Sequence, residues 1–183
     1  MTILHIDSSI NGENSASRQL SSSIVERVRR SSWGEQVVYR DLAADPLAHL
    51  TLDAFADTTV LDEFLAADVL VIGAPMYNFT LPTQLKAWID RILVAGKTFK
   101  YGPNGPEGLA TGKRVIIGVA RGNVYSGEAP AAALEHVETY LRHVFNFIGI
   151  EPEFVVAEGL AISPEQRDQS LELALGETVR LAA

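Results

Sequence analysis

Short apolar runs, rich in β-branched residues, alternate with amphipathic stretches along the whole chain. The runs lie at 3–7, 37–39, 69–72, 115–119 and 154–156. Strands that are separated by helices pair in parallel, and a parallel sheet is stable when helices cover both of its faces. We therefore predict an α/β fold, with a doubly wound five-stranded parallel sheet and helices on both faces. At this length, residues 1–183 are expected to form one domain.

The stretches between the runs carry apolar residues at helical spacing, and each set predicts one buried helix face. These sets are Leu20, Ile24 and Val28; Leu61 and Leu65; Leu85, Trp88, Ile89, Ile92 and Leu93; and Leu134, Val137, Leu141, Val144, Phe145 and Ile148. Pro82 suits the first turn of the third helix. The sequence Ser163-Pro164-Glu165-Gln166 has a capping-box pattern that opens a last helix. Between them, the Gly/Pro-rich segment 102–106 predicts a loop or hairpin.

Composition excludes several classes of protein. The net charge is −8, from 15 Lys and Arg against 23 Asp and Glu, which works against binding a nucleic-acid backbone. No apolar stretch is long enough to cross a bilayer, and residues 1–6 are typical of a strand, not of a signal peptide. We expect a cytoplasmic protein with no membrane and no nucleic-acid partner. Cysteine is absent, which excludes thiol chemistry.

The histidines do not predict a metal site. They are His5, His49, His136 and His143. His136 and His143 are seven residues apart, too far for the usual pair of ligands on one helix. We expect packed or surface histidines and no bound metal.

The loops at the carboxyl ends of the strands are the expected ligand site, because open parallel sheets bind ligands there, at the point where the strand order reverses. Segment 8–17 is rich in hydroxyl and amide groups and leads into a helix, whose N-terminus offers free N–H groups and a positive dipole end. Ser9, Ser15 and Ser17 could hold a phosphate there. A plain helix cap by Ser15 or Ser17 explains the same residues equally well. The sequence has neither G-x-x-x-x-G-K-[ST] nor, after the first strand, G-x-G-x-x-G, which favours a mononucleotide.

Two further loops predict contacts with a flat ring. Segment 74–82 places a methionine, two aromatic rings and an amide at the end of the third strand. The alternative is that Phe79 and Leu81 merely pack under the next helix, but an apolar cluster at a solvent-facing strand end favours ligand contact. Segment 120–123 follows the fourth strand, and Gly122 permits a close approach of the backbone.

A resemblance to a known family rests on motifs spread over nearly the whole chain. They are Pro75-Met76-Tyr77-Asn78-Phe79 with Pro82, Lys86 to Asp90, Thr98-Phe99-Lys100-Tyr101, Asn104 to Leu109, Arg121-Gly122, Phe147 to Ile150 and Ala157-Glu158-Gly159. Together they resemble the FMN-dependent NADH:quinone oxidoreductases, also called azoreductases. The resemblance implies a flavodoxin-like homodimer with FMN at the dimer interface. It also implies ping-pong transfer of reducing equivalents from NADH or NADPH to quinones and aromatic azo compounds.

The resemblance also implies the site residues, with the flavin and no side chain carrying the catalysis. Those implied for FMN are Ser9, Ser15, Ala16 and Ser17 at the phosphate, Pro75, Met76, Tyr77, Asn78 and Phe79 at the ring and ribityl chain, and Ala120, Arg121, Gly122 and Asn123 at the pyrimidine end. Tyr101 and Phe145 resemble aromatic residues on the substrate side, from this chain or from the partner subunit. The family commonly has serine before Arg-Gly and glycine after it, where this chain has Ala120 and Asn123. Segment 41–67 also looks shorter than in long members.

Two other functions remain open at this point. One is a non-enzymatic flavodoxin-like electron carrier. Segment 98–109 argues against it, because this apolar and glycine-rich segment could build a substrate pocket. The other is a flavin-free binding or regulatory protein on the same scaffold. Fold analogy alone does not choose between them, whereas the loop residues favour the enzyme.

Overall fold

The computed structural model describes residues 1–30 and 36–181. Its strands are β1 (Thr2–Asp7), β2 (Gln36–Asp41), β3 (Val69–Pro75), β4 (Phe99–Gly102), β5 (Gly105–Gly108), β6 (Arg114–Ala120) and β7 (Glu153–Ala157). Its α-helices are α1 (Ala16–Arg30), α2 (Thr59–Ala66), α3 (Thr83–Ile92), α4 (Glu138–Phe147) and α5 (Pro164–Thr178). Short 3₁₀ turns lie at Gly12–Asn14, Asp53–Ala56 and Ala132–Leu134.

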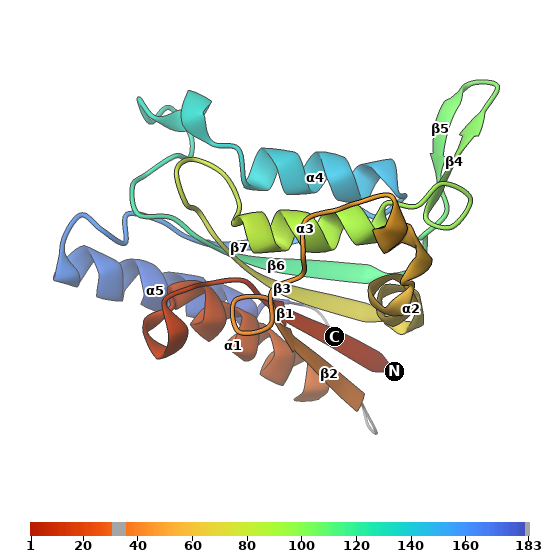
Figure 1. Cartoon of the computed structure of the whole chain (residues 1–183). Helices are drawn as coiled ribbons and strands as arrows, with labels where there is room; N and C mark the ends of the chain where they lie inside the picture. The colour runs from red at the N-terminus through yellow and green to blue at the C-terminus, as the bar shows by residue number, and fades with distance from the viewer. Residues whose placement is uncertain (31–35, 182–183) are drawn as a thin grey trace.

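The main sheet has five strands in the order β2-β1-β3-β6-β7, and every pair in it is parallel. Figure 1 shows α1 and α5 on one face of this sheet and α2, α3 and α4 on the other. Two apolar cores separate the layers, one beneath each set of helices. The predicted doubly wound α/β fold is confirmed, and the strand order reverses between β1 and β3, where a ligand site is expected.

Two glycines let α1 lie close against the sheet. A Cβ at Gly118 in β6 would lie 2.8 Å from the Cβ of Leu20 in α1, closer than real Cβ atoms approach. A Cβ at Gly73 in β3 would lie 3.1 Å from the Ser17 carbonyl oxygen in α1, which is a tight contact with backbone. These glycines therefore fix how near the N-terminus of α1 lies to the carboxyl ends of β1, β3 and β6.

Segment 102–106 lies in the β4–β5 hairpin, whose strands are antiparallel and are joined by a turn at Pro103 and Asn104. The hairpin lies at the end of the sheet away from the carboxyl ends of the parallel strands (Figure 1). In the described part of the chain, no helix has the length and apolar character needed to span a bilayer.

The helix boundaries correct two sequence predictions. Leu134 was expected on the face of the fourth helix, but it lies in a 3₁₀ turn and is exposed. The helix begins later because the Glu135 carboxylate accepts the N–H groups of Val137, Glu138 and Thr139. Pro82 is the N-cap residue of α3 and not part of its first turn. The cap of α5 is as predicted, since the Ser163 hydroxyl accepts the N–H of Gln166 and a proline follows the cap.

Candidate functional site

A cavity of about 220 Å³ opens at the carboxyl ends of β1, β3, β6 and β7. Its walls come from the loop before α1, from the ends of β3 and β6, from the loop after β7 and from the side of α5. The lining residues are Ser9, Asn11, Asn14, Ser15, Ala16, Ser17, Pro75, Met76, Tyr77, Ala120, Arg121, Gly122, Leu160, Ala161 and Arg167. The three loops singled out in the sequence thus meet at one place.

The N-terminus of α1 forms the polar end of this cavity. The Ser15 hydroxyl accepts the N–H of Arg18 at 3.2 Å, so Ser15 caps the helix, and it also lies 3.1 Å from the Ser17 hydroxyl. The N–H groups of Ala16 and Ser17 belong to the first turn, where the helix itself provides no acceptor. Capping and anion binding are therefore compatible here, because the cap uses one donor and leaves others directed at the helix end.

Tyr77 joins the loop after β3 to the loop after β1. Its phenolic oxygen lies 3.1 Å from the Ser9 hydroxyl and accepts the N–H of Ile10 at 3.2 Å. Ser9 is almost fully buried beneath it. The aromatic loop and the hydroxyl-rich loop therefore form one connected wall.

Asn78 and Phe79 form a tight turn that follows this wall. Tyr77 and Thr80 exchange two backbone hydrogen bonds, of 2.9 and 3.1 Å, and the two residues between them have φ angles of 49° and 73°. Asparagine tolerates such angles, but phenylalanine rarely adopts them. Phe79 is also 46% exposed, so burial does not hold it in this conformation. A strained, exposed aromatic residue beside a cavity is typical of a binding site.

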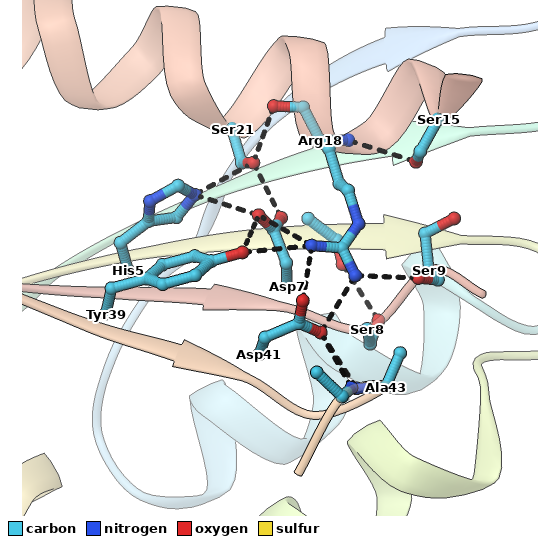
Figure 2. Close-up of polar contacts among 12 residues, drawn as sticks. His5, Asp7, Ser8, Ser9, Ser15, Arg18, Ser21, Tyr39, Asp41 and Ala43 are labelled. Carbon is cyan, nitrogen blue, oxygen red and sulfur yellow. Dashed lines mark hydrogen bonds and ion pairs between the residues drawn. The ribbon is translucent and has the colours of Figure 1, made fainter. Parts of the chain in front are cut away.

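A network of charged and polar side chains lies beside the polar end of the cavity (Figure 2). The guanidinium of Arg18 donates two hydrogen bonds of 2.8 Å to the Asp41 carboxylate and a third, also of 2.8 Å, to the Ser9 carbonyl. Arg18 thereby ties the first loop to the end of β2. The hydrogen bond from Arg18 holds the pKa of Asp41 below its usual value.

The same network continues into the core through β1. The His5 ring lies 2.9 Å from the Ser21 hydroxyl, which donates to the Asp7 carboxylate. Burial lowers the pKa of His5 against the opposing effect of Asp7. Burial, together with the negative charge of Asp7, raises the pKa of Tyr39 to about 12. His5 is packed, as predicted, and His49, His136 and His143 are exposed.

The loop after β6 is held by backbone bonds and by a buried arginine. Leu160 and Ala161 donate to the carbonyls of Arg121 and Gly122, at 3.1 and 2.8 Å. The Arg121 guanidinium is 3% exposed and lies 3.5–3.6 Å from the carboxylates of Glu135, Glu138 and Glu158. Three carboxylates therefore balance its charge.

Not every predicted site residue lines the cavity. Ten of the thirteen residues predicted for the cofactor do, and the other three, Asn78, Phe79 and Asn123, are not among its lining residues. Phe145, which was predicted on the substrate side, is fully buried in the core above the sheet and does not line the cavity. Tyr101 is 75% exposed on the β4–β5 hairpin, away from the cavity of its own chain (Figure 1).

The sequence analysis missed lining residues from the loop after β7 and from α5, namely Leu160, Ala161 and Arg167. The strand order could have revealed them, because the carboxyl end of β7 lies at the same edge of the sheet. In the described residues, no cluster of three or more His, Cys, Asp or Glu side chains is arranged to hold a metal ion.

The strand order and the site at its reversal point place the chain in the flavodoxin-like class, and the family model for the flavodoxin-like fold matches residues 1–181. An FMN-dependent NADH:quinone oxidoreductase from Bradyrhizobium diazoefficiens is 54% identical over the full length of both chains. The chain belongs to this family of flavin-dependent oxidoreductases.

Solved structures agree with this assignment. An azoreductase from Bacillus anthracis has a TM-score of 0.89 and 29% identity, with 99% of this chain and 98% of that chain covered. A second B. anthracis structure, an FMN-dependent NADH-azoreductase in complex with FMN, has a TM-score of 0.85 and 25% identity over the whole of both chains.

The donor groups of the cavity fit the cofactor of this family. A phosphate group accepts hydrogen bonds, and the buried hydroxyls of Ser9, Ser15 and Ser17 lie with the first turn of α1 at one end. The apolar side chain of Met76 and the ring of Tyr77 also line the cavity and offer a surface on which a flat ring could rest. The residues present therefore fit FMN.

Proposed function

We propose that this chain binds FMN in the cavity and uses it to pass reducing equivalents from NADH or NADPH to quinones and aromatic azo compounds. The observation that carries the proposal is the meeting of an α1 N-terminus rich in buried hydroxyls with the Met76–Tyr77 wall. When bound, FMN supplies the redox chemistry, taking electrons from a reduced nicotinamide and giving them to a flat acceptor.

The side chains hold and orient the cofactor. Ser9, Ser15 and Ser17, with the first N–H groups of α1, bind the phosphate. Pro75, Met76 and Tyr77 support the ring and ribityl chain, and the turn at Asn78 and Phe79 covers the outer part of the ring. Ala120, Gly122 and Asn123 would hold the pyrimidine end, where backbone N–H groups would supply hydrogen-bond donors to the ring. Donor and acceptor use the same exposed face in turn, which makes the kinetics ping-pong.

A homodimer belongs to this proposal. At about 220 Å³, the cavity is smaller than the roughly 300–1,000 Å³ that encloses an ordinary ligand, so one chain covers only part of FMN. Tyr101 is exposed on the β4–β5 hairpin, at the opposite end of its own sheet, and the proposal places it at the site of another copy. Residues 1–183 then act as one FMN-binding domain in each subunit. The cytoplasm is the proposed location because NADH, the proposed donor, is held inside the cell.

Steady-state kinetics test the reaction scheme. Initial rates are measured at several fixed quinone concentrations while NADH is varied, and the double-reciprocal lines are expected to be parallel. Intersecting lines would mean that donor and acceptor are bound at the same time. They would contradict the proposal that both use the same face of the flavin, one after the other. A bound flavin with no NADH or NADPH oxidation at all would instead favour the electron carrier.

A further inference from the structure

The cavity has two cationic side chains in its wall, and they differ in what surrounds them. Arg121 is buried against three carboxylates at 3.5–3.6 Å. Arg167 comes from α5 and is half-buried. Among the described residues, the Arg167 guanidinium has one hydrogen-bond partner, the carbonyl of Asn14 at 3.1 Å, and no carboxylate within 4.0 Å.

We infer that Arg167 is a phosphate-binding residue that makes this site specific for FMN over riboflavin. The inference rests on the proposed function, because it requires that the cofactor phosphate lies at the N-terminus of α1. The contact with Asn14 brings the guanidinium to the loop that ends at Ser15. An arginine has five N–H donors in a planar fork, so one bond to a carbonyl leaves donors for an anion.

The charges near the loop show why a cation is needed there. A phosphate monoester carries about −1.5 to −2 at pH 7. Beneath the loop, Asp7 and Asp41 stand against the single guanidinium of Arg18, which is already bound to Asp41. The helix end and the hydroxyls supply dipoles but no full charge. Arg167 is the cavity-lining cation whose charge is not balanced by a carboxylate in the described part of the chain.

The position of Arg167 in α5 is set by the cap of that helix. Ser163 caps α5 with Pro164 after it, which fixes where the first turn begins. Arg167 donates its backbone N–H to the Ser163 carbonyl at 3.0 Å, so it lies at the end of that first turn. The last helix of the chain thereby reaches a cofactor site that is otherwise built on β1, β3 and β6.

The experiment compares two ligands that differ only in the phosphate. Dissociation constants of FMN and of riboflavin are measured by flavin fluorescence, at low and at high salt, for the wild type, Arg167→Gln, Arg167→Lys and Arg29→Gln. Arg29 is exposed in the last turn of α1, and its replacement changes the net charge equally. Thermal unfolding of each variant reports whether the fold is retained.

For Arg167→Gln, we expect the dissociation constant of FMN to rise roughly tenfold and that of riboflavin to change less than about twofold. FMN binding by this variant should also depend less on salt concentration than FMN binding by the wild type. Arg167→Lys should keep part of the preference for FMN over riboflavin, and Arg29→Gln should keep all of that preference. Equal weakening of both ligands, or an unchanged preference for FMN, would overturn the role of Arg167. A wild type whose dissociation constant for riboflavin equals that for FMN would overturn the phosphate site itself, and with it the proposed function.

Discussion

The guanidinium of Arg18 in α1 and the carboxylate of Asp41 at the end of β2 form a two-pronged ion pair, with both hydrogen bonds at 2.8 Å. The same guanidinium donates to the Ser9 carbonyl, and the Asp41 carboxylate accepts the N–H groups of Ala43 and Ala44. Two loops are therefore fixed by one pair. Figure 2 shows the pair next to Ser9, close to the start of α1, where we propose that the phosphate binds.

Replacing Asp41 by asparagine should change how stability depends on pH. The hydrogen bond from Arg18 holds the pKa of Asp41 below its ordinary 3.8 in the folded state. The stabilisation is therefore fully present above that pH and is lost as the pH falls through the lower folded pKa. Urea unfolding of both proteins, from about pH 6 to about pH 3, should show the difference in free energy shrinking at the acid end. A difference that stays constant over this range would contradict the pairing.

Replacing Gly118 by alanine should weaken both the fold and the cofactor site. The new Cβ would lie 2.8 Å from the Cβ of Leu20, so α1 must move away from the sheet. We expect a loss of about 1–3 kcal/mol in the free energy of unfolding, together with weaker FMN binding. Gly176→Ala is the matched control, because Gly176 is helical with open space around it. That change should raise stability by up to about 1 kcal/mol and leave FMN binding unchanged.

Replacing Phe79 by glycine should stabilise the protein and weaken ligand binding. The φ angle of 73° is strained for phenylalanine and relaxed for glycine, which is worth about 1 kcal/mol. Denaturant unfolding measures the gain in stability. Flavin fluorescence and the KM for a quinone measure how far the loss of the ring weakens binding. Phe79→Leu, which keeps the strain and removes the ring, should weaken binding without the gain. A destabilised Phe79→Gly would show that the ring contributes more to packing than its exposure indicates.

Replacing Tyr101 by alanine should affect the acceptor and not the cofactor. The side chain is 75% exposed, so the free energy of unfolding should change by less than about 0.5 kcal/mol. If Tyr101 lines the site of a partner subunit, kcat/KM for quinones should fall several-fold while the FMN dissociation constant stays the same. Light scattering should show a dimer for both proteins. A monomeric wild type with full activity would contradict this role.

The periodic patterns of the sequence predicted the strands, the sheet and most helices, because an element buried on one or both faces shows in its own residues. Leu134 was wrongly predicted to lie on the fourth helix. Its spacing suited the helix, but the carboxylate of Glu135 starts the helix after it. A local hydrogen bond of that kind depends on a side-chain conformation that periodicity does not show.

The candidate site was predictable where it depends on single loops and not where it depends on distant contacts. Ser15, Tyr77 and Gly122 line the cavity, as expected of loops at the carboxyl ends of strands. The pairing of Arg18 with Asp41 spans 23 residues, and the contact of Arg167 with Asn14 spans 153. Such contacts follow from which helices and strands become neighbours. The sequence pattern alone does not specify them.

The central claim is tested most directly by adding NADH, without oxygen, to the purified protein loaded with FMN. The visible spectrum of the bound flavin should bleach and should return when a quinone is added. Retention of the flavin through gel filtration confirms that it is bound. A bound flavin that dithionite bleaches but neither NADH nor NADPH does would contradict the account, since the site would then hold FMN without using it as a reductase.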